Sequence, residues 1–161
     1  QALGDWPCQV QQRGMTQASR EAFLAPYRAD GAPVMSLCVM GGIFAEGIDL
    51  PGRALDGVLI VGVGLPQVGL MQETLRESYE ARLGHGFRYA YQIPGMQKVA
   101  QAVGRVIRTE TDRGVAILLD DRYRQGDYRS LLPPHWRVCR GDAEALLRDF
   151  WQAEAKENPA E

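Results

Sequence analysis

The sequence has 161 residues, of which 45% are hydrophobic and 24% charged, a balance that fits one globular domain and excludes a disordered polymer. Its longest apolar runs, Val34–Met40 and Gly57–Leu65, are far shorter than the ~20 residues needed to cross a bilayer. We therefore expect a cytoplasmic protein without membrane contact, with a single domain at residues 1–156 and a frayed tail at 157–161. The three cysteines lie far apart with no CxxC pair, so we expect reduced thiols and no metal site.

Charge is distributed unevenly along the chain. The segment Lys98–Arg140 holds nine Lys or Arg against five Asp or Glu, and the remainder holds nine against fifteen. Such asymmetry suggests a face that meets an anion. High arginine use throughout, 16 Arg against 2 Lys, is the alternative explanation, and charge alone does not decide between the two. The chain begins at Gln1 without a basic-then-apolar signal segment, and we expect it to be part of a longer protein.

Strand-like and helix-like segments alternate along the chain. In order, the sequence predicts a strand at Cys8–Gln12, a helix from the N-cap Thr16 to about Arg28, strands at Val34–Met40 and Leu55–Val63, helices at Met71–Arg82 and Met96–Arg108, a strand at Val115–Leu119, an edge strand at Trp136–Cys139 and a helix at Ala143–Ala155. This alternation predicts an α/β fold with a parallel sheet flanked by helices. The sheet is short at its start, so we expect the fold to be N-terminally incomplete.

The most informative motif is Gln101-Ala-Val-Gly-Arg-Val-Ile-Arg108. On a helix, Gln101, Arg105 and Arg108 stand at i, i+4 and i+7 and point in one direction. Gly104 between them allows a backbone or a phosphate to approach closely. Two guanidiniums offer planar forks of donors that suit phosphoryl oxygens. The alternative is a solvated helix face with two surface arginines; four fixed identities in eight residues favour the functional interpretation.

A glycine-rich loop, Gly41–Gly52, follows a predicted strand, where open α/β sheets place their ligands. Gly41 and Gly42 expose backbone N–H groups to phosphates. Within Glu46-Gly47-Ile48-Asp49, the sequence suggests that Asp49 accepts a bond from a ribose hydroxyl or holds an arginine, and that Glu46 braces the loop. The alternative is an ordinary turn with capping acids. Phe44 either stacks on a base or tucks under the loop.

Other patterns carry less weight. The run Leu59–Gln67 looks like a dinucleotide-binding turn, but Gln67 stands where the third glycine belongs and Pro66 disturbs the helix start. Asp120-Asp121-Arg122 follows a predicted strand and is either an interdomain ion-pair cluster or a structural cap. The sequence contains no GxSxG and no GxxxxGK[ST], so a nucleotide would have to be held by a partner domain.

Two segments resemble motifs of superfamily 2 helicases. Gly41–Gly52 resembles motif V, and Gln101–Arg108 with Thr109–Gly114 resembles motif VI. The form Phe-Ala-Glu-Gly-Ile-Asp-Leu-Pro-Gly, followed by a strand ending Gly-Leu-Pro, is similar to the XPD/DinG branch. Tyr91–Arg105 and Leu131–Trp136 resemble its bacterial members, and the likeness spans about Ala22 to Val138.

The resemblance implies the second RecA-like motor domain of an ATP-dependent helicase that moves along single-stranded DNA. Arg105 and Arg108 would then contact the γ-phosphate, Gln101 would sense the nucleotide, and Glu46, Gly47 and Asp49 would lie at the nucleotide. The stretch Gly41-Gly42-Ile43-Phe44 would face DNA. ATP and Mg²⁺ would be held mainly by a first RecA-like domain, as would any iron–sulfur cluster. The alternative is a non-catalytic nucleic-acid or protein-interaction module with the same fold.

Overall fold

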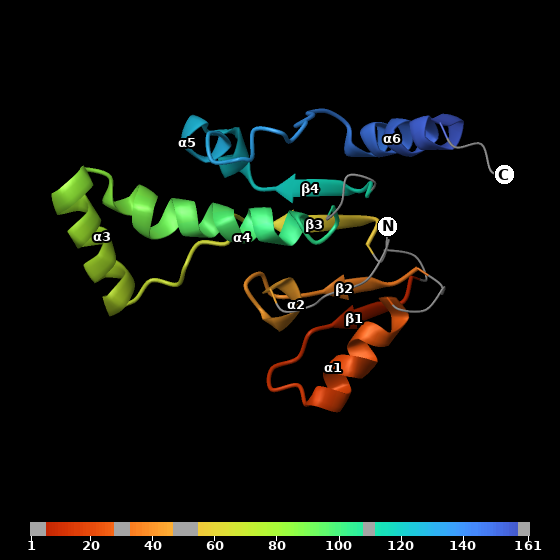
Figure 1. The fold of residues 1–161 in the computed structure, drawn as a ribbon, viewed down its shortest axis with the longest axis horizontal. Helices are drawn as coiled ribbons and strands as arrows, with labels where there is room; N and C mark the ends of the chain where they lie inside the picture. The colour runs from red at the N-terminus through yellow and green to blue at the C-terminus, as the bar shows by residue number, and fades with distance from the viewer. Residues whose placement is uncertain (1–5, 28–32, 47–54, 108–111, 158–161) are drawn as a thin grey trace.

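The computed structural model describes residues 6–27, 33–46, 55–107 and 112–157. Its elements in chain order are β1 (Cys8–Val10), α1 (Gln17–Leu24), the 3₁₀ helix η1 (Ala25–Tyr27), β2 (Met35–Leu37), α2 (Ile43–Glu46), β3 (Gly57–Val61), α3 (Leu70–Leu83), the π-helix η2 (Arg88–Gln92), α4 (Ile93–Val103), β4 (Val115–Leu119), the 3₁₀ helix η3 (Asp121–Arg124), α5 (Gly126–Arg129) and α6 (Ala143–Glu157) (Figure 1). Strands and helices alternate as the sequence predicted.

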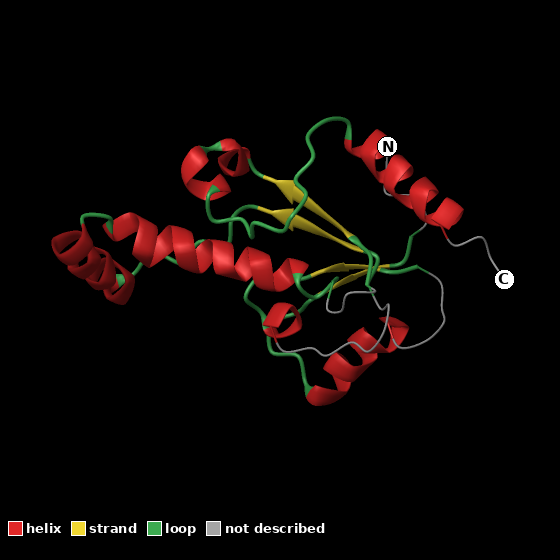
Figure 2. Cartoon of the chain, turned by 45° about the horizontal axis from the view of Figure 1, so that its top comes forward, coloured by secondary structure: helices red, strands yellow, loops and turns green. Residues whose placement is uncertain are grey.

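The described strands pair only in parallel, which confirms the predicted sheet type. β1 pairs with β2 from the register position Cys8↔Met35, and β3 pairs with β4 from Gly57↔Val115. Within the described part of the chain these pairs form two separate two-stranded sheets, with helices around them (Figure 2). The carboxyl ends of β3 and β4 lie at one edge, where the loops that follow them emerge.

Several predicted elements differ from the structure, and three of the differences are described here. The first helix becomes a 3₁₀ turn at Ala25 rather than continuing to Arg28, because Pro26 has no N–H to donate. β2 ends at Leu37, since the chain turns at Val39, whose carbonyl accepts a 2.9 Å bond from the Gly42 N–H. The expected edge strand at 136–139 is irregular and pairs with neither described sheet.

The larger hydrophobic core, here called the α4 core, lies between α4 and the β3–β4 sheet. Its buried side chains come from β3 and the loop after it, from α4 and from the segment after β4: Ile60, Val63, Met96, Val99, Val103, Tyr123 and Tyr128. Along α4 they recur every three or four residues, which is one helical face. The loop after β3 approaches this helix closely, because a Cβ on Gly95 would lie 2.6 Å from the Val63 carbonyl oxygen.

The smaller core, here called the α1 core, lies under β1 and β2. It buries Phe23, Leu24 and Phe44, and the rings of Phe23 and Phe44 stack with centroids 4.3 Å apart. Met15, Tyr27 and Leu55 pack around it. This core connects α1 to α2, so it positions the glycine-containing segment between β2 and α2.

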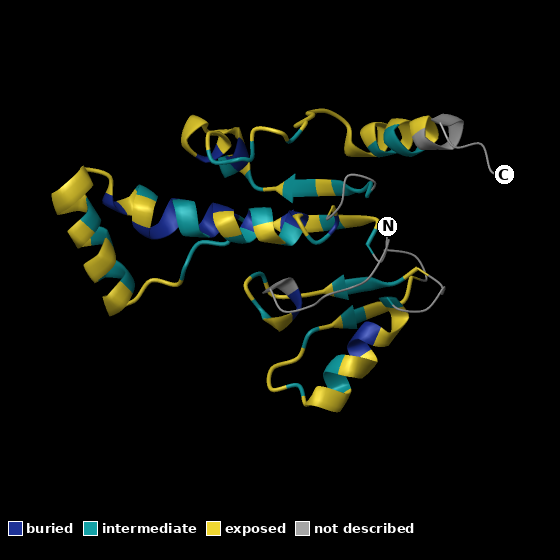
Figure 3. Cartoon of the chain, in the orientation of Figure 1, coloured by how far each residue is buried: buried dark blue, intermediate teal, exposed yellow. Residues whose placement is uncertain are grey.

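The β3–β4 sheet is apolar on both faces but covered on one. Val58 and Ile60 pack in the α4 core, whereas Leu59 and Val61 alternate to the other face and are 56% and 73% exposed (Figure 3). Leu119, the register partner of Val61, is 49% exposed as well. The described helices are too short or too polar to span a membrane.

Candidate nucleotide and nucleic-acid site

The position of Gln101 follows from the packing of α4. The helix continues directly from the π-helix η2, has Pro94 in its first turn, and buries Met96, Val99 and Val103. Gln101 lies on the other side of α4 and is exposed. The amphipathic pattern therefore presents this amide to whatever binds the outer face of α4.

The predicted helix from Met96 to Arg108 is wrong at its end, while Arg108 itself lies outside the described residues. The α-helix ends at Val103, and the next turn is tighter: the Arg105 and Val106 N–H groups donate to the carbonyls of Ala102 and Val103, at 3.2 and 2.9 Å. Val106 is buried, and this tightened turn leaves Arg105 half-buried. Arg105 thus projects from a turn at the helix end.

Gly104 lies in this tightened turn, and its role as a close-approach residue stays a prediction. Within the described chain, the atoms within 4 Å of a Cβ placed there are the carbonyl oxygens of Ala100 and Gln101, both in its own preceding turn. Its φ of −62° is one that any residue adopts. Neither backbone conformation nor packing against another described element requires this glycine, so the surface beside it is open to a ligand.

Several site residues lie outside the described residues: Arg108, Gly47 and Asp49. Glu46 ends α2, but only its backbone is described. Their assignment to the nucleotide remains a prediction from the sequence.

The segment Gly41–Ile43 connects the two cores, since the residues on either side of it pack into different cores. Met40 before it packs against the α4 core, and Phe44 after it is buried in the α1 core. Gly41 has a φ of 77°, a left-handed conformation that glycine adopts without strain, and it is exposed like Ile43. Of the two alternatives for Phe44, the structure agrees with tucking under the loop, because the ring is buried and stacks on Phe23.

The two motif-bearing segments come together in the fold. α2, at the end of the glycine segment, contacts α4, which carries Gln101 (Figure 1). Met40 also contacts this region, because its Sδ lies 2.6 Å from where a Cβ on Gly64 would stand, and Gly64 adjoins Gly95 of α4. The expected nucleic-acid segment and the expected nucleotide helix are therefore mechanically connected.

The segment after β4 is a structural cap. Arg122 donates from Nε and Nη2 to the two carboxylate oxygens of Asp120, at 2.8 and 2.7 Å, and its backbone N–H donates to the same carboxylate at 2.9 Å. These bonds lower the pKa of Asp120 to about 2. The Tyr123 hydroxyl donates to the Gly62 carbonyl oxygen at 2.6 Å, and burial raises its pKa to about 12. Of the two alternatives for Asp120-Asp121-Arg122, capping is the one observed.

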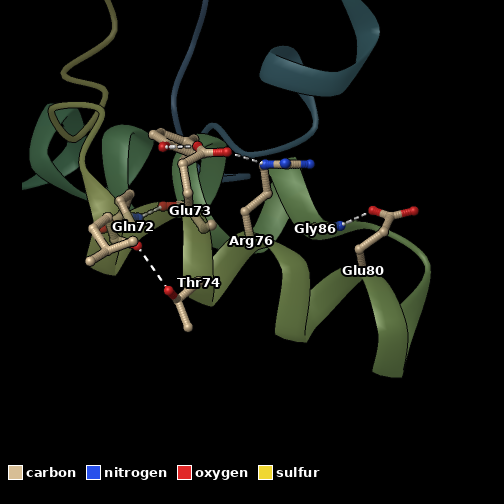
Figure 4. Close-up of polar contacts among 9 residues, drawn as sticks. Gln72, Glu73, Thr74, Arg76, Glu80 and Gly86 are labelled. Carbon is tan, nitrogen blue, oxygen red and sulfur yellow. Dashed lines mark hydrogen bonds and ion pairs between the residues drawn. The ribbon is translucent and has the colours of Figure 1, made fainter.

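A polar network that the sequence did not reveal anchors the start of α4. The Tyr91 hydroxyl donates to Glu73 Oε1 at 2.5 Å, and Arg76 Nε donates to Glu73 Oε2 at 2.8 Å (Figure 4). The Tyr91 and Arg76 bonds together lower the pKa of Glu73. Gln72 donates to the Ala90 carbonyl beside them. Because Tyr91 lies in the π-helix that leads into α4, this network fixes α3 against that helix.

The geometry defines a class: a parallel α/β domain in which a glycine turn after one strand touches a helix with an exposed amide and a terminal arginine. The sequence matches the family described as "Helicase C-terminal domain" over residues 2–139. The chain belongs to this family, and its relatives place it in the XPD/DinG-like branch, as the motif resemblance indicated.

Three relatives illustrate the similarity. The chain is 32% identical over 162 residues to the ATP-dependent helicase DinG of Mycobacterium tuberculosis, covering 89% of this chain and 24% of that protein. It is 36% identical over 103 residues to the ATP-dependent DNA helicase DinG of Photobacterium profundum, covering 60% and 15%. It is 27% identical over 145 residues to the ATP-dependent DNA helicase chl1 of Aspergillus clavatus, covering 79% and 20%. The chain spans a quarter or less of the length of these curated relatives.

Proposed function

We propose that this chain is the second RecA-like motor domain of an ATP-dependent DNA helicase, which works in the cytoplasm with a first RecA-like domain on single-stranded DNA. The observation that carries the proposal is the contact between α2 and α4. It joins a segment suited to phosphate backbones, Gly41–Ile43, to a helix that ends in the Gln101 and Arg105 pattern. A motor needs such a connection to couple nucleotide state to grip on DNA.

The chemistry of the nucleotide side follows from the residues. ATP would lie between the two motor domains, with Arg105 and Arg108 donating to the oxygens of the γ-phosphoryl group as charge develops on them. Arginines supplied across an interface accelerate related phosphoryl transfers by about 10³–10⁵. Gln101, exposed one turn earlier, would contact the nucleotide and report its presence to α4. Asp49, Gly47 and Glu46 would adjoin the ribose side.

The DNA side works through backbone groups. Gly41, Gly42 and Ile43 would contact phosphates, while Phe44 holds the segment from within the α1 core. Domain closure on ATP would pull α4, and α2 in contact with it, towards the first domain; hydrolysis would release them. Each cycle then shifts the grip on the strand.

Magnesium fits the first motor domain better than this chain. Among the described residues, no group of three or more His, Cys, Asp or Glu side chains stands close enough to hold a metal ion. We assign Mg²⁺ and the phosphate loop to the first domain, and no iron–sulfur cluster to this chain, whose Cys8, Cys38 and Cys139 are exposed on different segments. The full-length protein is therefore the species to assay.

The test is Arg108→Ala in the full-length protein. Loss of a finger arginine should reduce DNA-stimulated ATP turnover by roughly 10³ or more, because the transition-state charge loses its donor. Arg137→Ala is the matched control: it removes an exposed arginine of the same chain and should turn over ATP normally. Circular dichroism should show both variants folded. Wild-type turnover by Arg108→Ala would refute the finger assignment.

A second measurement separates the motor from the non-catalytic module. Isothermal titration of the 161-residue chain alone with ATP should give at most weak binding, since it holds half of the site. If the full-length wild-type protein binds single-stranded DNA but does not hydrolyse ATP, the interaction-module alternative replaces the helicase proposal.

A further inference from the structure

The turn that carries Gly41 and Gly42 is held by the side chain of Gln11, which directly follows β1. The β1–β2 ladder continues to the bond from the Gln11 N–H to the Leu37 carbonyl, at 2.9 Å. Beyond this bond, the next N–H group after β2 that could continue the ladder is that of Val39. It donates to the Gln11 side-chain oxygen Oε1 at 3.0 Å instead of to a backbone carbonyl. A carboxamide thus takes the place of the missing strand at the point where the turn begins.

This bond fixes which way the Gln11 amide faces. Since a backbone N–H can only donate, the atom next to Val39 must be the side-chain oxygen, and Nε2 points elsewhere. Nε2 lies beside Gly42: a Cβ placed on that glycine would be 3.0 Å from Nε2 and 3.3 Å from Oε1. Gly42 therefore lets the Gln11 amide lie against the turn, and a side chain at position 42 would displace it.

Gln9, which lies within β1, shows how a glutamine amide is arranged when its bonds are made inside the protein. Two residues before Gln11, it donates from Nε2 to both the Phe23 carbonyl and the Ser36 hydroxyl, each at 2.8 Å. Both of its N–H groups are used inside the protein. Gln11 Nε2 makes no hydrogen bond to any described residue, although its oxygen is bonded. Its two N–H groups are left for a ligand.

We propose that Gln11 both positions the nucleic-acid turn and donates from Nε2 to a phosphate of the bound single strand. The inference rests on the proposed function, because it takes Gly41–Ile43 as the DNA-contacting segment. Neutral amides and backbone N–H groups are ordinary phosphate donors in protein–nucleic acid contacts. The exposed Gly41 and the Gln11 amide would grip the same strand from the two sides of Gly42.

The first test is Gln11→Glu in the full-length protein, assayed by fluorescence anisotropy with labelled oligo-dT. Glutamate keeps an oxygen for the Val39 N–H, so the turn survives, but it replaces the donor with a second carboxylate oxygen. We expect about tenfold weaker binding, the size of one lost bond to a charged group. Gln12→Glu is the matched control, adding the same charge at an exposed neighbour, and should weaken binding less than about twofold. Equal affinities for the two variants would overturn the inference.

The second test distinguishes a phosphate contact from a purely structural role. Gln11→Met removes both polar atoms at nearly constant length, and each protein is titrated with oligonucleotides carrying one neutral methylphosphonate at successive positions. If Nε2 donates to a phosphate, one position should weaken the wild type and leave Gln11→Met unaffected, which is coupling in a double-mutant cycle. A uniform loss at every position would overturn the phosphate contact. A wild-type protein that binds no single-stranded DNA would refute the proposed function itself.

Discussion

The two cores of this domain are stabilised by different kinds of interaction. Among the described residues, the α4 core buries seven side chains around one helix and one sheet, whereas the α1 core buries three. Around the α1 core, side-chain amides and hydroxyls supply the remaining contacts, such as Gln9 to Ser36 and Tyr27 to Ser36. Apolar burial is the dominant favourable term in folding, while a hydrogen bond contributes about 1 kcal/mol net.

This difference assigns the two regions different mechanical roles. We expect the α4 core to be the more rigid part, and it holds α4, the helix that leads to the arginines proposed to contact the nucleotide. The α1 core holds one end of the turn proposed to contact DNA, and its small size predicts that it opens more readily. A turn tied to both cores through Met40 and Phe44 can move with one while the other stays fixed.

The largest effect should come from Phe23→Ala, which removes one of three buried side chains of the α1 core and the ring stacked on Phe44. We expect a loss of about 3 kcal/mol in the stability of this region. Hydrogen–deuterium exchange should show lost protection in β1 and β2 while α4 stays protected. Phe87→Ala, at an exposed phenylalanine, is the control. Equal deprotection of α4 would mean that the two cores unfold as one unit.

The second-largest expected effect concerns the stability of the α4 core. Val99 is fully buried in the α4 core, and Val99→Ala removes two methyl groups and leaves a cavity. We expect about 2 kcal/mol lower stability in urea unfolding. Val68→Ala makes the same chemical change at a side chain that is 74% exposed, and should stay within about 0.5 kcal/mol of wild type. A similar loss in both variants would contradict the central place of α4.

A smaller effect concerns the network before α4. Tyr91→Phe removes the hydroxyl that donates to Glu73 and keeps the buried ring. We expect about 1 kcal/mol lower stability, measured by thermal unfolding. Tyr89→Phe is the control on the same π-helix, because that side chain is partly exposed. If both variants melt alike, the bond to Glu73 does not anchor α3.

Much of the fold could be predicted because it depends on local patterns. The run around Val58–Val61 and the period of Met96, Val99 and Val103 each determine their element and its buried face. What could not be predicted depends on pairs of residues distant in sequence. Among the described strands, the pairing of β1 with β2 and of β3 with β4 is not encoded in any one segment.

In the candidate site, too, local features could be predicted from the sequence and long-range contacts could not. Gln101 is exposed, but the predicted helix ran past its true end at Val103, because Gly104, which caps it, was interpreted as a close-approach residue within the helix. Gln11 carried no recognisable motif at all. Its importance arises only when β1 brings it against Val39 and Gly42, which are about thirty residues away in sequence.

The smallest effect tests whether polar contacts also matter in the rigid half. Arg122 lowers the pKa of Asp120 to about 2 from its ordinary 3.8, so the folded state favours the charged carboxylate. The resulting stabilisation is complete above about pH 4 and is lost as pH falls through 2, because the unfolded chain binds the proton first. Arg122 is 38% exposed, and solvent screening should limit the contribution to below about 1 kcal/mol.

Asp120→Asn, which cannot titrate, should flatten the fall in urea stability between pH 4 and 2. Asp121→Asn, at the exposed neighbour, should leave that fall unchanged, and a profile for Asp120→Asn as steep as wild type would show that this ion pair does not contribute to it.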